Sequence, residues 1–75
     1  MRTDYEWLVA LGRQADRLAA SVDYLFACRD QGYDDGSALA VMREDLARYR
    51  ATLEAAPLRV VTQHAFEHPN SRQGR

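Results

Sequence analysis

Hydrophobic residues in the N-terminal part of the chain recur every three or four positions. The stripe consists of Leu8, Leu11, Ala15, Leu18, Val22 and Leu25. This spacing is typical of an amphipathic helix that packs along one seam. Thr3 and Glu6 fit a capping box at its start, and Gly32 is a natural left-handed stop at its end. The pattern predicts a helix over residues 3–31.

A second stripe with the same spacing follows a turn-rich stretch, residues 30–37 (DQGYDDGS). Its members are Leu39, Met42, Leu46, Tyr49, Leu53 and Ala56. Ser37 is the candidate N-cap, and Pro57 marks the end, so we expect a helix over 37–56. Glu44 precedes Arg48 by four residues, a spacing that favours an ion pair on the helix surface. Two such helices joined by a short turn form an antiparallel hairpin, so the predicted fold class is all-α.

The two predicted helices differ in length, so the first should extend past the end of the second. Tyr5, Trp7 and Leu8 lie on this extension and require a cover. The segment 57–68 contains Leu58, Val60, Val61 and Phe66 and is the candidate. Both a short helix and a strand arm fit its residues, because proline suits a first helical turn while adjacent valines favour a strand. Residues 1–68 are expected to form one small domain, and 69–75 a flexible tail.

Charge and cysteine content restrict the function. The 75 residues carry ten basic and eleven acidic side chains, a formal charge of −1, unlike the basic domains that bind nucleic acids generally. The single cysteine, Cys28, cannot form an internal disulfide, and no secretory leader opens the chain. No apolar run approaches the length that a membrane helix needs. We therefore expect a cytoplasmic protein that does not span a membrane.

Every basic residue is arginine, and the chain contains no lysine. This bias indicates a GC-rich source genome rather than guanidinium chemistry. Small chains from GC-rich bacteria and their phages often inhibit or regulate larger machines. This general class, rather than any residue motif, makes an anti-defence protein of the anti-CRISPR kind the favoured specific function.

His64, Glu67 and His68 match the H-x-x-E-H string of one class of zinc proteases. A catalytic zinc usually takes three protein ligands, and the other soft ligand, Cys28, belongs to a distant helix. The acidic turn fits no EF-hand frame: with Gly36 at position six, positions one and twelve are Gln31 and Met42, and with Asp30 at position one, positions six and twelve are Asp35 and Val41. Neither serine has the histidine and aspartate neighbours of a nucleophile. We expect no enzyme, no cofactor and no metal site.

Several apolar and acidic side chains fall outside the two stripes. They are Tyr5, Trp7, Val9, Tyr24, Tyr33, Asp34 and Asp35, and we predict that they bind a partner. The stripes could also pair with those of a second chain, because a two-helix hairpin has little interior, and this gives a dimeric four-helix bundle.

The sequence thus favours a small non-catalytic module that binds another protein or protein complex, acts as its inhibitor or regulator, and forms a homo-oligomer. An alternative is a nucleic-acid-associated regulator that contacts phosphate through Arg59, Arg72 and Arg75. A third hypothesis is a metal-dependent activity at the H-x-x-E-H string.

Overall fold

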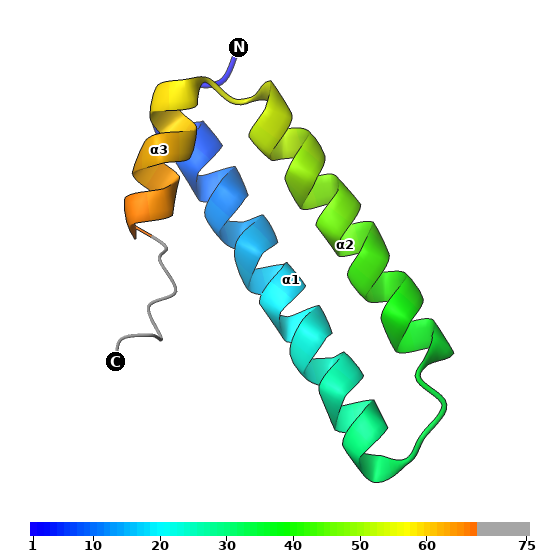
Figure 1. Ribbon diagram of the computed structural model, residues 1–75. Helices are drawn as coiled ribbons and strands as arrows, with labels where there is room; N and C mark the ends of the chain where they lie inside the picture. Colours follow the sequence, from blue (N-terminus) through cyan, green and yellow to red (C-terminus); the bar gives the residue numbers. More distant parts are fainter. Residues whose placement is uncertain (68–75) are drawn as a thin grey trace.

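The computed structural model describes residues 1–67, which form three α-helices. They are α1 (Asp4–Gln31), α2 (Gly36–Ala55) and α3 (Leu58–Glu67). α1 and α2 run side by side in opposite directions, and α3 lies against the N-terminal half of α1 (Figure 1). The all-α hairpin is confirmed, and the third element is a helix, so the strand alternative is wrong. His68 and the predicted tail, 69–75, lie outside the described residues.

Both ends of α1 follow the predicted caps. The Thr3 hydroxyl accepts the Glu6 N–H at 3.1 Å, and a Glu6 carboxylate oxygen accepts the Thr3 N–H at 2.8 Å. At the other end Gly32 has a φ of 76°, a conformation that residues with a Cβ rarely adopt. Its N–H and that of Tyr33 bond back to carbonyls of the last turn. The chain therefore reverses after Gln31.

The start of α2 differs from the prediction. Asp35, rather than Ser37, occupies the N-cap position, although its side chain makes no capping bond. Its carboxylate instead accepts a hydrogen bond from Arg29 Nε at 2.6 Å, and the Gly36 N–H donates to Asp34 Oδ1 at 3.0 Å. The helix begins one residue before Ser37 because these two aspartates organise the turn.

In the packing of α1 on α2, the second helix is rotated relative to the predicted stripe. Leu25, Cys28 and Ala38 are buried together, with Leu39 and Met42 against them. Further along α2, Asp45 is 5% exposed whereas Leu46 is 37% exposed. The prediction that Leu46 lies in the seam is therefore wrong. Asp45 tolerates burial because its carboxylate is hydrogen-bonded on both oxygens.

α3 is fastened by two polar contacts as well as by packing. Arg59 donates two hydrogen bonds to the Asp4 carboxylate, at 2.9 and 2.8 Å. Tyr49 Oη and His64 Nε2 lie 2.7 Å apart and share a hydrogen bond that joins α2 to α3. Val60 and His64 are buried, as the covering role of this segment requires.

Only some of the residues expected to cover the N-terminal part of α1 do so. Leu58 and Phe66 are exposed, so the prediction that they contribute to it is wrong. Each lies two positions from a buried residue, about 200° around the helix, and therefore on the outer face. None of the described helices is long and apolar enough to cross a bilayer.

Candidate functional site

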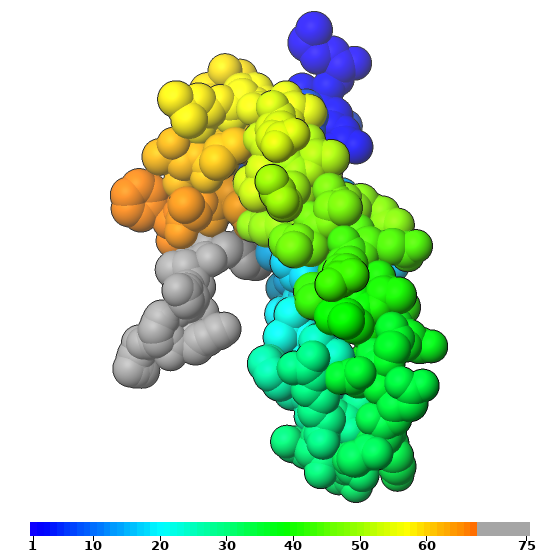
Figure 2. Space-filling view, turned by 45° about the vertical axis from the view of Figure 1, so that its right-hand side comes forward, coloured from blue at the N-terminus to red at the C-terminus, as the bar shows by residue number. Residues whose placement is uncertain are grey.

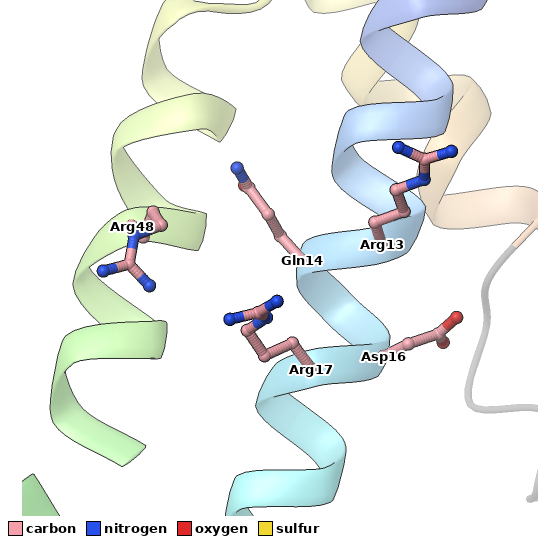
Figure 3. Close-up of a pocket in the computed structure, with 5 residues that line it drawn as sticks. All are labelled: Arg13, Gln14, Asp16, Arg17 and Arg48. Atoms are coloured by element: carbon pink, nitrogen blue, oxygen red, sulfur yellow. The ribbon is translucent and has the colours of Figure 1, made fainter. Parts of the chain in front are cut away.

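One side of the hairpin carries a groove that follows both α1 and α2. Two adjoining hollows along it share Arg17 and Arg48. Figure 3 shows this side: Arg17 and Gln14 extend from α1 toward α2, whereas Asp16 points away from α2. We call this side the groove flank, and the residues that matter below are Arg13, Gln14, Arg17, Tyr24, Val41 and Arg48.

A buried carboxylate forms the polar base of the groove. The Ser21 hydroxyl donates a hydrogen bond to one Asp45 oxygen, and Arg48 Nη1 donates to the other at 3.1 Å. The predicted pair of Glu44 with Arg48 is therefore replaced by an ion pair with Asp45, three residues away. Because Asp45 holds the Arg48 guanidinium from below, that cation is fixed at the edge of the groove.

Two further cations in the groove are not neutralised. Arg13 and Arg17 are exposed, and neither makes an ion pair within residues 1–67. The Gln14 side-chain oxygen is buried without a hydrogen-bond partner in the same part of the chain. A buried amide without a partner costs free energy that a bound polar group can recover. The groove thus offers guanidinium donors to an acidic ligand, whereas the Gln14 oxygen is an acceptor and would need a donor group of the partner, such as a backbone N–H.

Tyr24 supplies the aromatic surface beside these cations. Hydrogen bonding with the Cys28 thiol raises the pKa of Tyr24 above its usual value of 10.0. Val41 lines the same hollow from α2 and is also exposed. Exposed apolar groups beside unpaired guanidinium groups resemble the composition of protein interfaces, in which tyrosine and arginine are enriched.

The groove continues toward the N-terminus of α1. Exposed Tyr5 and half-buried Val9 line a further hollow that shares Arg13 with the groove. Trp7 was predicted to lie on the part of the first helix that extends past the second. In the structure it is half-buried, and the Arg2 guanidinium lies 4.8 Å from its ring centroid. The last turns of α2 reach this level, and Ala51 and Ala55 line a hollow together with Trp7.

The other predicted residues lie at the turn, on the far end of the molecule. Tyr33 is exposed, whereas the Asp34 and Asp35 carboxylates take part in the turn contacts described above. α1 has 28 residues and is therefore about 42 Å long, which separates the two ends. The structure thus places Tyr24 in the groove, places Tyr5 and Val9 in a separate hollow on α1 that adjoins the groove at Arg13, and leaves the acidic turn as a third region.

The H-x-x-E-H string is occupied by structural contacts as far as it is described. His64 is buried and bonded to Tyr49, and Glu67 accepts a hydrogen bond from Gln63 at 3.0 Å. Among residues 1–67, no three histidine, cysteine or carboxylate side chains are grouped as a metal ion requires. Burial raises the pKa of Tyr49 above its usual value of 10.0.

Arg13, Arg17 and Gln14 were not expected to form part of a site. The sequence assigns the two arginines to a solvated helix face, and half-buried Gln14 falls outside the apolar stripe. The available signal was electrostatic: the arginines are one turn apart, and no acidic residue lies four positions from either. Asp16 lies three positions from Arg13 on the same helix, but the two side chains form no ion pair in the structure.

Comparison with known proteins identifies no relative. No family model matches the chain. No curated protein and no solved structure matches it either. The description of the candidate site therefore depends on the geometry of the groove flank.

Proposed function

We propose that this protein is a non-catalytic binding module that docks an acidic surface of another protein into the groove flank. Binding there would inhibit or regulate a larger complex. The observation that carries the proposal is the juxtaposition of two unneutralised guanidinium groups, Arg13 and Arg17, with the exposed ring of Tyr24 on one groove.

The charge distribution supports an acidic partner. The two hollows are lined by three arginines and by three carboxylates, those of Asp16, Glu44 and Asp45, so the positive charge is local to the guanidinium groups that form no ion pair. Arg48 is fixed by Asp45, which leaves Arg13 and Arg17 to meet carboxylates of the partner. Guanidinium groups bind carboxylates through two parallel hydrogen bonds, which gives orientation as well as attraction.

Two other functions compete with this one, and no specific observation favours either. A nucleic-acid contact would use Arg59, which is engaged by Asp4, together with Arg72 and Arg75, which lie outside the described residues. A metal site would use His64, whose Nε2 is bonded to Tyr49.

Photo-crosslinking from the groove tests the proposal. A benzoylphenylalanine at position 24 should give a discrete crosslinked product with one cellular or phage protein. Replacing Arg13 and Arg17 by Glu should remove that product, because like charges then face each other across the interface. The same probe at position 66, which is exposed on α3, serves as the control and should not give the product.

The matched charge control is the pair Arg43→Glu and Arg50→Glu, which changes the net charge equally at exposed positions of α2 that do not line the two hollows. These variants should keep the crosslink. A product that survives the Arg13 and Arg17 replacements, or that forms equally well from position 66, would contradict docking in the groove.

The anti-CRISPR form of the proposal has its own test. In bacteria with an active CRISPR system, the wild-type protein should increase the plating efficiency of a targeted phage. The Arg13→Glu, Arg17→Glu variant should lose that effect. Plating that stays unchanged with the wild-type protein, while the crosslink still forms, would reject this specific role and keep the binding module.

A further inference from the structure

The side of the hairpin opposite the groove flank is apolar and only half covered. Val22 and Phe26 on α1 lie two positions on either side of Tyr24, a turn of about 200°, and thus on the other flank. Leu39 is likewise two positions from Val41, and Leu46 is two positions from Glu44. With Met42 between them on α2, these residues form a continuous surface, which we call the apolar flank: Val22, Phe26, Leu39, Met42 and Leu46.

α3 lies on this same side but stops short of the apolar flank. Its partner Asp4 begins a row that continues along α1 through Leu8, Leu11, Ala15 and Val22 at helical spacing. Its other partner, Tyr49, is seven residues from Met42 and on the same face of α2. Figures 1 and 2 show that, of the three helices in residues 1–67, only α1 and α2 reach the half of the hairpin near the turn. Phe26 and Leu46 are exposed there.

An acidic residue of α1 and a basic residue of α2 lie at the same height beside the apolar flank. The hydrogen bond between Ser21 and Asp45 places these residues at the same height along the hairpin. The helices are antiparallel, so a step of two residues forward in α1 and a step of two residues backward in α2 move the same distance along the hairpin. Asp23 and Arg43 therefore also lie at one height. Both are exposed, and each turns to the outer edge of its helix on the apolar side.

These two residues belong to longer charged edges with a spacing of seven. The edge of α1 is acidic at Asp23 and Asp30, and the edge of α2 is basic at Arg43 and Arg50. Asp16, seven positions before Asp23, points away from α2 in Figure 3 but lines the first hollow of the groove flank. Oppositely charged edges that flank an apolar seam are the pattern by which helical bundles select partners.

We propose that a second copy of this chain covers the apolar flank, with the two copies related by a two-fold axis parallel to the hairpin. Rotation about such an axis preserves height, so α1 of one copy packs against α2 of the other. Asp23 of each copy then meets Arg43 of the other, twice in the dimer, while the apolar flanks form the core of a four-helix bundle. The groove flanks remain free on the two outer sides.

The charges also reject the other two-fold arrangement. An axis perpendicular to the hairpin, passing through the height of Asp23 and Arg43, stacks α1 on α1 and α2 on α2. Asp23 then faces Asp23 and Arg43 faces Arg43, and like charges at an interface oppose association. The inference does not depend on the proposed function, because it concerns the opposite flank.

Charge reversal and its rescue test this dimer. Sedimentation velocity across a wide concentration range should show a monomer–dimer equilibrium for the wild-type chain. Asp23→Arg and Arg43→Asp should each raise the dissociation constant at least about tenfold, because each creates two like-charge contacts per dimer. The double variant Asp23→Arg, Arg43→Asp should recover most of the lost affinity.

Arg17→Asp on the groove flank is the matched control and should leave the dimer unchanged. Circular dichroism confirms that the variants stay helical, since all three positions are exposed. A wild-type chain that stays monomeric throughout would overturn the proposal and leave the flank to a different protein. If both single variants dimerise more weakly and the double variant does not recover the affinity, the proposed arrangement of the two copies would be overturned.

Discussion

The two sides of the same hairpin differ in what they leave unsatisfied. The groove flank has unpaired polar groups around a buried carboxylate, whereas the apolar flank has uncovered hydrocarbon. The difference originates in one rotation of α2. With Asp45 rather than Leu46 in the seam, the leucine stripe turns toward the side of α3, and the polar residues turn toward the groove. One helix register therefore produces two surfaces of different chemistry.

The largest effect should come from the core that both flanks share. Leu11 is fully buried, and Leu11→Ala should cost about 2–5 kcal/mol of unfolding free energy, which is most of the stability of a domain this small. Leu46→Ala is the matched control and should cost less at low protein concentration, because Leu46 is 37% exposed in the monomer whereas Leu11 is fully buried. Urea titrations followed by circular dichroism measure both. Equal losses would show that Leu46 belongs to the core after all.

The next effect isolates the groove flank. Ser21→Ala removes the hydroxyl that donates to the buried Asp45 carboxylate and should cost about 1–3 kcal/mol in thermal or urea unfolding. Ser37→Ala, at an exposed serine near the start of α2, should be neutral. If the two variants unfold alike, the carboxylate network does not support the groove.

A smaller loss of stability is expected where α3 covers the hairpin. Tyr49→Phe removes the hydroxyl that bonds His64 Nε2 and should cost about 1–2 kcal/mol, with faster hydrogen exchange in α3. Tyr33→Phe, at an exposed ring, is the control. Unchanged exchange in α3 would mean that packing of Val60 alone holds this helix.

The smallest effect concerns the ion pair that fastens α3 at the N-terminus. Hydrogen bonds from Arg59 hold the pKa of Asp4 below its usual value of 3.8. A carboxylate with a lowered folded-state pKa stabilises the fold above its unfolded pKa, and this contribution is lost as pH falls through the folded value. Asp4→Asn should therefore speed amide hydrogen exchange in α3 at neutral pH. In the variant, the stability of α3 should also depend less on pH in the acid range than it does in the wild type. A wild-type acid profile in the variant would contradict the contact.

Local signals made the fold predictable from the sequence. The capping box of Thr3 and Glu6 and the left-handed Gly32 depend on neighbouring residues only, and both occur as expected. The rotation of α2 depends instead on Ser21, twenty-four positions before Asp45, which satisfies the buried carboxylate. No periodicity within α2 reports such a contact, so Leu46 was assigned to the core.

The candidate site was less predictable for the same reason. Tyr5, Val9 and Tyr24 could be proposed from the sequence because exposed aromatic and apolar residues outside a stripe are visible there. Arg13 and Arg17 were overlooked because an arginine on a polar face looks ordinary until the structure shows that it forms no ion pair. The turn contacts of Asp34 and Asp35 were not predicted because they depend on Gly36 and Arg29, and the partner-binding role of these two residues stays a prediction.

Tyr24 and Phe26 allow the most direct test of the claim that the two flanks bind different surfaces. The two rings are two positions apart on one helix and are similarly exposed, at 62% and 55%. Sedimentation velocity of Tyr24→Ser and Phe26→Ser measures what each ring contributes to self-association. We expect the dissociation constant of the dimer to rise at least about tenfold for Phe26→Ser and to stay unchanged for Tyr24→Ser. Equal effects of the two substitutions, or a larger effect at Tyr24, would contradict the account.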